Sequence, residues 1–277
     1  MKHRLLKVCL ILILGLVCWV YQAWPSTRTE IVICDVGQGD AILITQGFFQ
    51  VLIDGGPDDS VQSCLAENIP FWDKSLELLV VTHADDDHIS GLSSVLTKFQ
   101  VQTTLISDWK QTQTAQNLKK LLKQESLNGM ELKEAISGHS VSLPSGGVVQ
   151  VLYPFEPWHV AKMGQKGHPN DSLTEIMLSD KNQTIFEEDK NGNARSIVLL
   201  LSLHYFDLLL MGDAPQSTEL ALIKKGLIKR VEGLKIGHHG SKTSTSLAFL
   251  QLAQPEICLL SCGNNNFLNH TASQVLT

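Results

Sequence analysis

The stretch Thr82-His83-Ala84-Asp85-Asp86-Asp87-His88 decides how this chain is interpreted. It follows the apolar run ELLVVT (77–82), which is typical of a buried strand, and it precedes ISGLSSVLTKF (89–99), whose apolar spacing predicts a helix. A turn at this point would direct several side chains into one pocket. The potential metal ligands are His83, Asp85, Asp87 and His88. Imidazole and carboxylate together suit Zn(II), Mn(II) or Fe(II) rather than Ca(II). An acidic helix N-terminus would explain the aspartates but not the two histidines.

Two more potential ligand sets follow apolar runs further along the chain. Asp213 ends LLLMGD (208–213), and His238 and His239 follow LKIG (234–237). Each of these residues alone would be interpreted as structural. Their repetition at predicted strand ends indicates that they complete a dinuclear metal site.

Short apolar strands alternate with helices through most of the chain. The predicted strands cover residues 30–34, 41–45, 48–53, 77–82, 101–106, 148–153, 196–203, 206–211, 231–236 and 256–261. Between Pro154 and Asn193 the sequence is rich in Gly, Asn, Asp and Lys, which predicts a long surface excursion. The pattern indicates an α/β fold with a single domain over residues 27–277.

Composition and charge narrow the class of protein. The 277 residues are 43% hydrophobic and 18% charged, which excludes a disordered, collagen-like or coiled-coil chain. The net charge is −6, although Lys2, Arg4 and Lys7 lie at the extreme N-terminus. The rest of the chain is therefore acidic, and an extended positively charged surface for nucleic-acid binding is not expected.

The N-terminus has the pattern of an export signal. A basic segment precedes an uncharged run from Val8 to Trp24, so residues 1–26 are predicted to be a signal anchor or signal peptide. An uncleaved anchor is favoured because no small-x-small cleavage pattern is present. The body would then lie outside the cytoplasm, or be secreted if the segment is cleaved. Cys34 and Cys258 are expected to be buried free thiols, while a disulfide is permitted but not implied.

Taken in order, the motifs resemble a known family. They are CDVGQGDAILI (34–44), LIDGG (52–56), THADDDHISGL (82–92), SIVLLL (196–201), LLLMGDA (208–214), LKIGHHGSKTSTS (234–246) and NNNFLNH (264–270). The set resembles the metallo-β-lactamase superfamily, and in particular the C-terminal hydrolase domain of ComEC-type DNA-uptake competence proteins, without their multi-pass membrane portion. This resemblance implies a four-layered αβ/βα sandwich, preceded here by the N-terminal apolar segment, with the active site along one edge.

The resemblance also implies a ligand set and two divalent ions, Zn(II) or Mn(II). His83 and Asp85 would bind the first ion, and Asp87, His88 and His238 the second, with Asp213 bridging both. The nearest match to the remaining first-site ligand is Asn193, with His168 and His159 as alternatives. Asn193, Ser241 and Lys242 are candidates for substrate binding.

A hydrolytic function follows from this ligand set. The resemblance to the competence proteins implies that metal-activated water attacks a phosphodiester, namely a nucleic-acid strand outside the membrane, with catalytic contributions from Asp87 and from His270 or His239. The alternatives are another hydrolase of the same fold, acting on wall phosphodiesters, β-lactams or thioesters, and a degenerate domain that binds metal or nucleic acid without turnover. Protein partners are not indicated.

Overall fold

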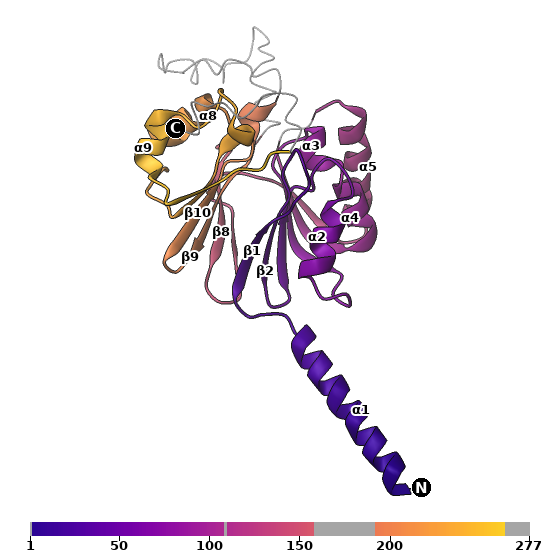
Figure 1. The fold of residues 1–277 in the computed structure, drawn as a ribbon. Helices are drawn as coiled ribbons and strands as arrows, with labels where there is room; N and C mark the ends of the chain where they lie inside the picture. The colour runs from indigo at the N-terminus through magenta and orange to yellow at the C-terminus, as the bar shows by residue number, and fades with distance from the viewer. Residues whose placement is uncertain (1, 108–109, 158–191, 264–277) are drawn as a thin grey trace, which may run out of the picture.

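The computed structural model describes residues 2–107, 110–157 and 192–263. In this part of the chain, two six-stranded mixed sheets lie face to face with helices on their outer faces (Figure 1). The expected four-layered αβ/βα sandwich is therefore confirmed.

The first sheet has the order β1-β2-β3-β4-β5-β6. Its strands are β1 (Thr29–Ile33), β2 (Ile42–Gln46), β3 (Phe49–Ile53), β4 (Ser75–Val81), β5 (Gln100–Ile106) and β6 (Glu131–Glu134). From β3 to β6 the neighbouring strands are parallel. The helices of this half are α2 (Val61–Asn68), α3 (Asp86–Ile89), α4 (Leu92–Lys98) and α5 (Gln113–Leu127).

The second sheet has the order β12-β11-β10-β9-β8-β7. Its strands are β7 (Ser140–Ser142), β8 (Val148–Tyr153), β9 (Val198–Leu203), β10 (Phe206–Leu210), β11 (Gly233–Lys235) and β12 (Ile257–Leu259). The last three strands are parallel to one another. The outer helices are α8 (Gln216–Lys224) and α9 (Leu247–Ala253), and short 3₁₀ turns η1 (Asn193–Arg195) and η2 (Gly237–Gly240) flank β9 and β11.

Successive side chains along each strand point alternately to its two faces, and this alternation produces the layers. In β2, Ile42 and Ile44 face the second sheet, whereas Leu43 between them packs under the helices of the first half. In β10, Leu208 and Leu210 face the first sheet and Leu209 packs under α8 and α9. Because successive strand residues point to opposite faces, strands that are apolar on both faces give three separate cores.

Two cysteines form an unexpected link in the first half. Cys34, directly after β1, is disulfide-bonded to Cys64 in α2. The expectation of a free thiol at Cys34 is therefore wrong, and Cys258 is exposed rather than buried. The disulfide anchors the loop that leads from β1 toward Asp40.

At the N-terminus, α1 spans Lys2–Ala23 and extends away from the sandwich (Figure 1). No helix among the described residues combines the length and the apolar character needed to cross a membrane. The signal anchor and the domain boundary at residue 26 stay predictions.

Candidate metal centre

The predicted ligands meet where strands of the two sheets end. Asp54 follows β3, His83 follows β4, and His88 lies in α3. From the other sheet, Asp213 follows β10 and His239 lies in η2 after β11. Since parallel strands present their carboxyl ends at one edge, residues far apart in sequence come together there.

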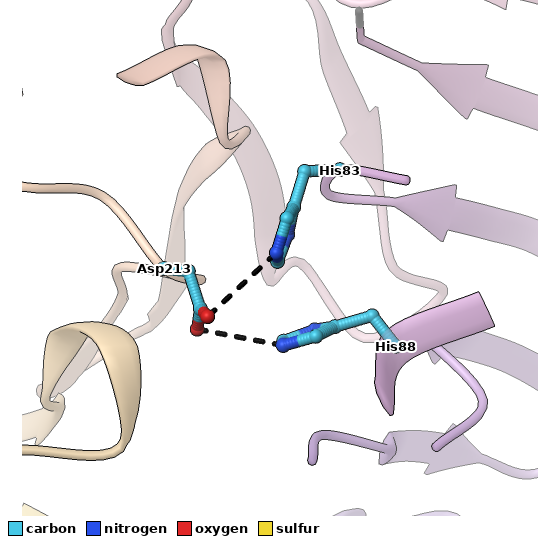
Figure 2. A group of neighbouring side chains, drawn as sticks. All are labelled: His83, His88 and Asp213. Atoms are coloured by element: carbon cyan, nitrogen blue, oxygen red, sulfur yellow. Dashed lines mark ion pairs between the residues drawn. The ribbon is translucent and has the colours of Figure 1, made fainter. Parts of the chain in front are cut away.

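Asp213 lies at the centre of the group. Its Oδ2 is 3.6 Å from Nε2 of His83, and its Oδ1 is 3.4 Å from Nε2 of His88 (Figure 2). Both separations exceed the ordinary N–H···O hydrogen-bond distance of about 2.9 Å. The two imidazole nitrogens and Oδ1 of Asp213 are buried and have no hydrogen-bond partner among the described residues. A divalent cation between them would satisfy all three atoms, so this donor set fits a metal ion.

His239 extends the same cluster toward Asp87. Its Nε2 is 3.4 Å from Oδ2 of Asp87 and 3.7 Å from Oδ1 of Asp213. Its Nδ1 lies 2.8 Å from the carbonyl oxygen of Ser261, which can only accept, so Nδ1 carries a hydrogen and Nε2 is available as a ligand. Asp87, His88 and His239 place one ligand atom each within 4.8 Å of the others, as do His83, His88 and Asp213.

His238 has a different position from the one expected. Its Nε2 is 3.8 Å from Oδ2 of Asp213, its Nδ1 is 3.4 Å from Oγ1 of Thr243, and 19% of its side chain is exposed. Both histidines have left-handed backbone angles, φ 48° at His238 and φ 50° at His239, so the turn directs only the second ring inward. The geometry therefore favours His239 over His238 as the ligand beside Asp87 and His88, and it leaves His238 at the rim.

Asp54 supports the centre through its contacts with Thr82 and His88. Its carboxylate accepts hydrogen bonds from the backbone N–H and Oγ1 of Thr82, and Oδ2 is 2.8 Å from Nδ1 of His88. This contact orients the ring so that Nε2 faces Asp213, an arrangement that is common behind metal-binding histidines. Asp54 therefore helps to position a candidate metal ligand, although its side chain lies behind the ring of His88.

Charge interactions between these groups shift their pKa values. Burial opposes the ionised form of Asp213, but the charge on His88 outweighs it and holds the pKa of Asp213 well below its usual range. Burial also opposes ionisation of Asp87, yet the close contact with His239 and the charge on His88 lower its pKa to about 2. Burial lowers the pKa of His83 well below 6.5. Two ionised carboxylates and a neutral imidazole are what a cation requires of its ligands.

Asp40, at the end of the GQGD turn, pairs with a buried lysine that sequence reasoning missed. Lys235 in β11 forms an ion pair with Oδ2 of Asp40, and both side chains are almost fully buried. Lys235 Nζ also lies 3.3 Å from the carbonyl oxygen of Gly212, next to Asp213. A lysine within the apolar run LKIG is a signal of such a pair, since a buried ammonium needs a partner.

Gly39 allows the turn that carries Asp40 to pack against the backbone of Asp87. Its φ is +124°, and a Cβ there would lie 1.9 Å from the carbonyl oxygen of Asp87. Glycine is therefore required at position 39 for this turn to lie against the backbone of Asp87.

Asp85, expected to bind the first ion, lies at the edge of the cluster. Its Oδ2 is 3.8 Å from Nε2 of His83, and its Oδ1 forms an ion pair with Lys110. Burial raises the pKa of Asp85, although the contact with Lys110 opposes the shift. Asn193 is buried in η1, and its Oδ1 has no hydrogen-bond partner in the described part of the chain.

The remaining predicted residues surround or lie outside this centre. Ser241 is buried and its Oγ is 3.0 Å from Oγ1 of Thr243, whereas Lys242 is exposed; both follow His238 in the same loop. His159, His168 and His270 fall outside the described residues.

Comparisons with known proteins agree with this architecture. The family model described as the metallo-beta-lactamase superfamily matches residues 34–185. The chain is 27% identical to ComE operon protein 3 of Bacillus subtilis over 91% of its length, and 23% identical to competence protein ComA of Neisseria gonorrhoeae over 96%. It spans only 30% and 31% of those relatives. Among solved structures it is similar to human tRNase Z, short form, with a TM-score of 0.48 and 11% identity, over 85% of this chain and 93% of that one.

Proposed function

This chain belongs to the metallo-β-lactamase superfamily, and we propose that it is a metal-dependent hydrolase of phosphodiester bonds, with a DNA strand as its substrate. The observation that carries the proposal is the buried cluster of His83, His88 and Asp213, whose ligand atoms converge without hydrogen-bond partners among the described residues. Similarity to competence proteins supports DNA as the substrate. Those relatives are far longer, so their other activities are not transferred.

The chain's own residues would each have a defined part in the reaction. When bound, a Zn(II) or Mn(II) ion would lower the pKa of a coordinated water and neutralise charge on the phosphoryl group. Asp213 and Asp87 would bind that ion as ionised carboxylates, because a nearby positive charge favours the ionised form. Asp54 would fix the ring of His88, and Ser261 would fix the tautomer of His239.

Residues at the rim would meet the substrate. His238 is partly exposed within 3.8 Å of Asp213, which would allow it to contact a phosphate or leaving-group oxygen. Lys242 and Ser241 follow it along the same loop. Because the net charge is −6, we expect a weak contact confined to this rim rather than an extended binding track.

We also propose that the folded body lies outside the cytoplasm. The Cys34–Cys64 disulfide supports this placement, because such bonds persist in oxidising compartments. The basic segment and apolar run at the N-terminus would direct export. Treatment of intact cells with an impermeant protease should degrade the body. Survival of the body in intact cells, followed by degradation after lysis, would place it in the cytoplasm.

The activity is tested with the full-length chain, depleted of metal by a chelator and then resupplied with Mn(II) or Zn(II). Substrates are single-stranded DNA, plasmid DNA, bis-p-nitrophenyl phosphate, a β-lactam and a thioester. We expect phosphodiester cleavage only with metal. Asp87→Ala should abolish it, while Asp86→Ala, an exposed carboxylate in the same turn, is the matched control. Preferential cleavage of the β-lactam or thioester would replace the proposed substrate class.

A further inference from the structure

We propose that the end of the sandwich remote from the metal centre rests on the surface of a lipid bilayer, through exposed aromatic side chains that gather there. This basal surface is formed by Trp24, Phe48, Phe71, Trp72 and Tyr205. Among the side chains that the structure describes, every exposed tryptophan, phenylalanine or tyrosine belongs to it. The proposal concerns the orientation of the body and is independent of the hydrolytic activity proposed above.

Strand direction places the basal surface opposite the metal centre. Phe48 directly precedes β3 and Tyr205 directly precedes β10, whereas Asp54 and Asp213 follow the same two strands. Trp72 lies shortly before β4, whose other end leads to the metal-binding loop. At about 3.3 Å per residue, the seven residues of β4 separate the two ends by about 20 Å. Substitutions on the basal surface therefore do not touch the metal centre.

Contacts between neighbouring turns join the first part of the basal surface into a strip. Trp24 packs edge-on against Phe48, in the turn between β2 and β3, with ring centroids 5.3 Å apart. Beside Phe48, Oε1 of Gln46 accepts a hydrogen bond of 2.7 Å from the backbone N–H of Ser145. Because Ser145 lies in the turn between β7 and β8, this bond connects the turns of the two sheets.

The strip continues toward both remaining parts of the surface. Gly146, in the same turn between β7 and β8, lies against the turn that carries Tyr205, because a Cβ at Gly146 would be 3.6 Å from Cε1 of His204. Phe71 and Trp72 form a second edge-on pair, with ring centroids 4.9 Å apart, in the loop that leads into β4 beside β3. The aromatic side chains thus occupy adjoining loops at one end of both sheets.

The residue types at this end suit the interface between lipid and water. A single exposed aromatic side chain is ordinary, but a group of them marks an interaction surface. Tryptophan and tyrosine combine an apolar ring with a polar group and are enriched at the headgroup level of membranes. Because the net charge is −6, attraction to anionic headgroups is not expected to carry the contact. Burial of the aromatic rings would carry it instead.

The helix α1 favours lipid over a protein as the occupant. Its residues Leu10, Ile11, Leu12, Ile13 and Leu14 are all exposed, and at about 100° per residue they cover the whole circumference. A helix that is apolar on every side requires apolar surroundings. The helix leaves the sandwich at the basal end, whereas α3 lies at the other end (Figure 1).

A hydrogen bond ties the start of the body to the basal surface. The backbone N–H of Gly47, next to Phe48, donates to the carbonyl oxygen of Ser26 at 2.7 Å. Lipid around α1 would therefore also meet the aromatic rings. The contact needs α1 to lie among lipids, not to cross the bilayer.

The test uses the full-length protein in phosphatidylcholine vesicles, with the four cysteines outside the Cys34–Cys64 disulfide replaced by alanine. A nitroxide label is attached to Ser145→Cys, within the basal strip, or to Ser217→Cys, an exposed control in α8 shortly after Asp213. Power saturation compares collisions of each label with oxygen, which concentrates in lipid, and with water-soluble chromium oxalate. We expect the label at 145 to be shielded from chromium oxalate and accessible to oxygen, and the label at 217 to show the reverse.

Removing the aromatic rings should release the body from the lipid. Phe48→Ser, Phe71→Ser and Tyr205→Ser are combined in one chain. In this variant, the label at 145 should lose its shielding and reach the accessibility of the label at 217.

Two further variants separate this effect from misfolding, with urea unfolding as a check on each. Tyr205→Ser alone removes a side chain that is 95% exposed and packs in no core, and it should produce part of the loss. The matched control removes exposed apolar side chains on α8 and α9 and should leave the label at 145 shielded. It combines Leu220→Ser, Leu247→Ser and Leu252→Ser.

A wild type whose label at 145 meets chromium oxalate as freely as the label at 217 would overturn the inference. Shielding that the aromatic triple variant retains would do the same. Shielding that is lost when the protein is diluted with excess lipid would identify a second copy of the chain as the occupant instead of lipid. None of these readouts depends on DNA cleavage, so the inference and the proposed function fail separately.

Discussion

Oδ2 of Asp54 lies 2.8 Å from Nδ1 of His88, and the same carboxylate accepts two hydrogen bonds from Thr82 at the end of β4. One buried residue after β3 therefore positions both the loop and the ring that carry the metal ligands.

Replacing Asp54 should weaken metal binding without unfolding the protein. Asp54→Asn keeps the shape of the side chain but removes the charge that orients His88. We expect metal affinity to fall by about 10–100-fold, as is usual when such supporting contacts are lost. Competition with a chelating indicator measures the change, with the exposed Asp58→Asn as control. Equal affinity in Asp54→Asn and wild type would show that this contact does not act on the metal.

The two neighbouring histidines should behave differently. His239→Ala removes a ring whose Nε2 faces Asp87 and Asp213, so metal binding and turnover should both be lost. His238→Ala removes a rim residue, and we expect the ion to be retained while KM or kcat for DNA worsens. Metal content and steady-state kinetics of the two variants separate the roles. The reverse result, with metal lost only in His238→Ala, would restore the ligand assignment predicted from sequence.

Metal affinity should increase with pH. Burial alone would lower the pKa of His88, but the carboxylates of Asp213 and Asp54 outweigh burial and raise it well above 6.5. The ring of the metal-free protein is therefore protonated at neutral pH, and an ion must displace that proton to reach Nε2. Affinity should rise as the pH rises through and above 6.5, with proton release on binding. Calorimetry in buffers of different ionisation enthalpy measures that release, and its absence would mean that His88 binds metal without losing a proton.

The sequence was sufficient to predict much of the fold because the strand pattern is strong. Ligand residues that follow apolar strands, such as Asp213 after LLLM, could be assigned to one edge without coordinates. The edge strands β6 and β7 were missed, since ELKE and SVS are short and largely exposed and lack an apolar alternation. Edge strands pair on one side only, and polar residues are common in them.

Other features depend on tertiary geometry and left little or no local signal. The choice between His238 and His239 is made by the left-handed turn of η2. The Cys34–Cys64 disulfide joins residues 30 apart, and neither cysteine lies in a motif that indicates pairing. Lys110 is an isolated lysine in a loop, and only the position of Asp85 relates it to the metal centre.

The buried pair of Lys235 and Asp40 should be important for stability. Lys235→Met leaves Asp40 buried without its partner, and breaking such a pair costs about 3–5 kcal/mol. Combining it with Asp40→Leu should recover most of the loss, because neither charge is then buried alone. Urea unfolding of the metal-free protein measures both, with the exposed Lys229→Met as control. A double variant as unstable as Lys235→Met would indicate that the pair has a structural role beyond mutual neutralisation.

The most direct test of the central claim compares wild type and Asp213→Asn for cleavage of end-labelled single-stranded DNA, with bound metal measured on the same samples. Asp213→Asn keeps the shape of the side chain but removes the negative charge between His83 and His88. We expect the metal-loaded wild type to cleave DNA, and Asp213→Asn to bind metal poorly and be slower by about 10³-fold or more, which corresponds to about 4 kcal/mol of barrier. A wild type that binds its ion yet leaves DNA and other phosphodiesters intact would contradict the account.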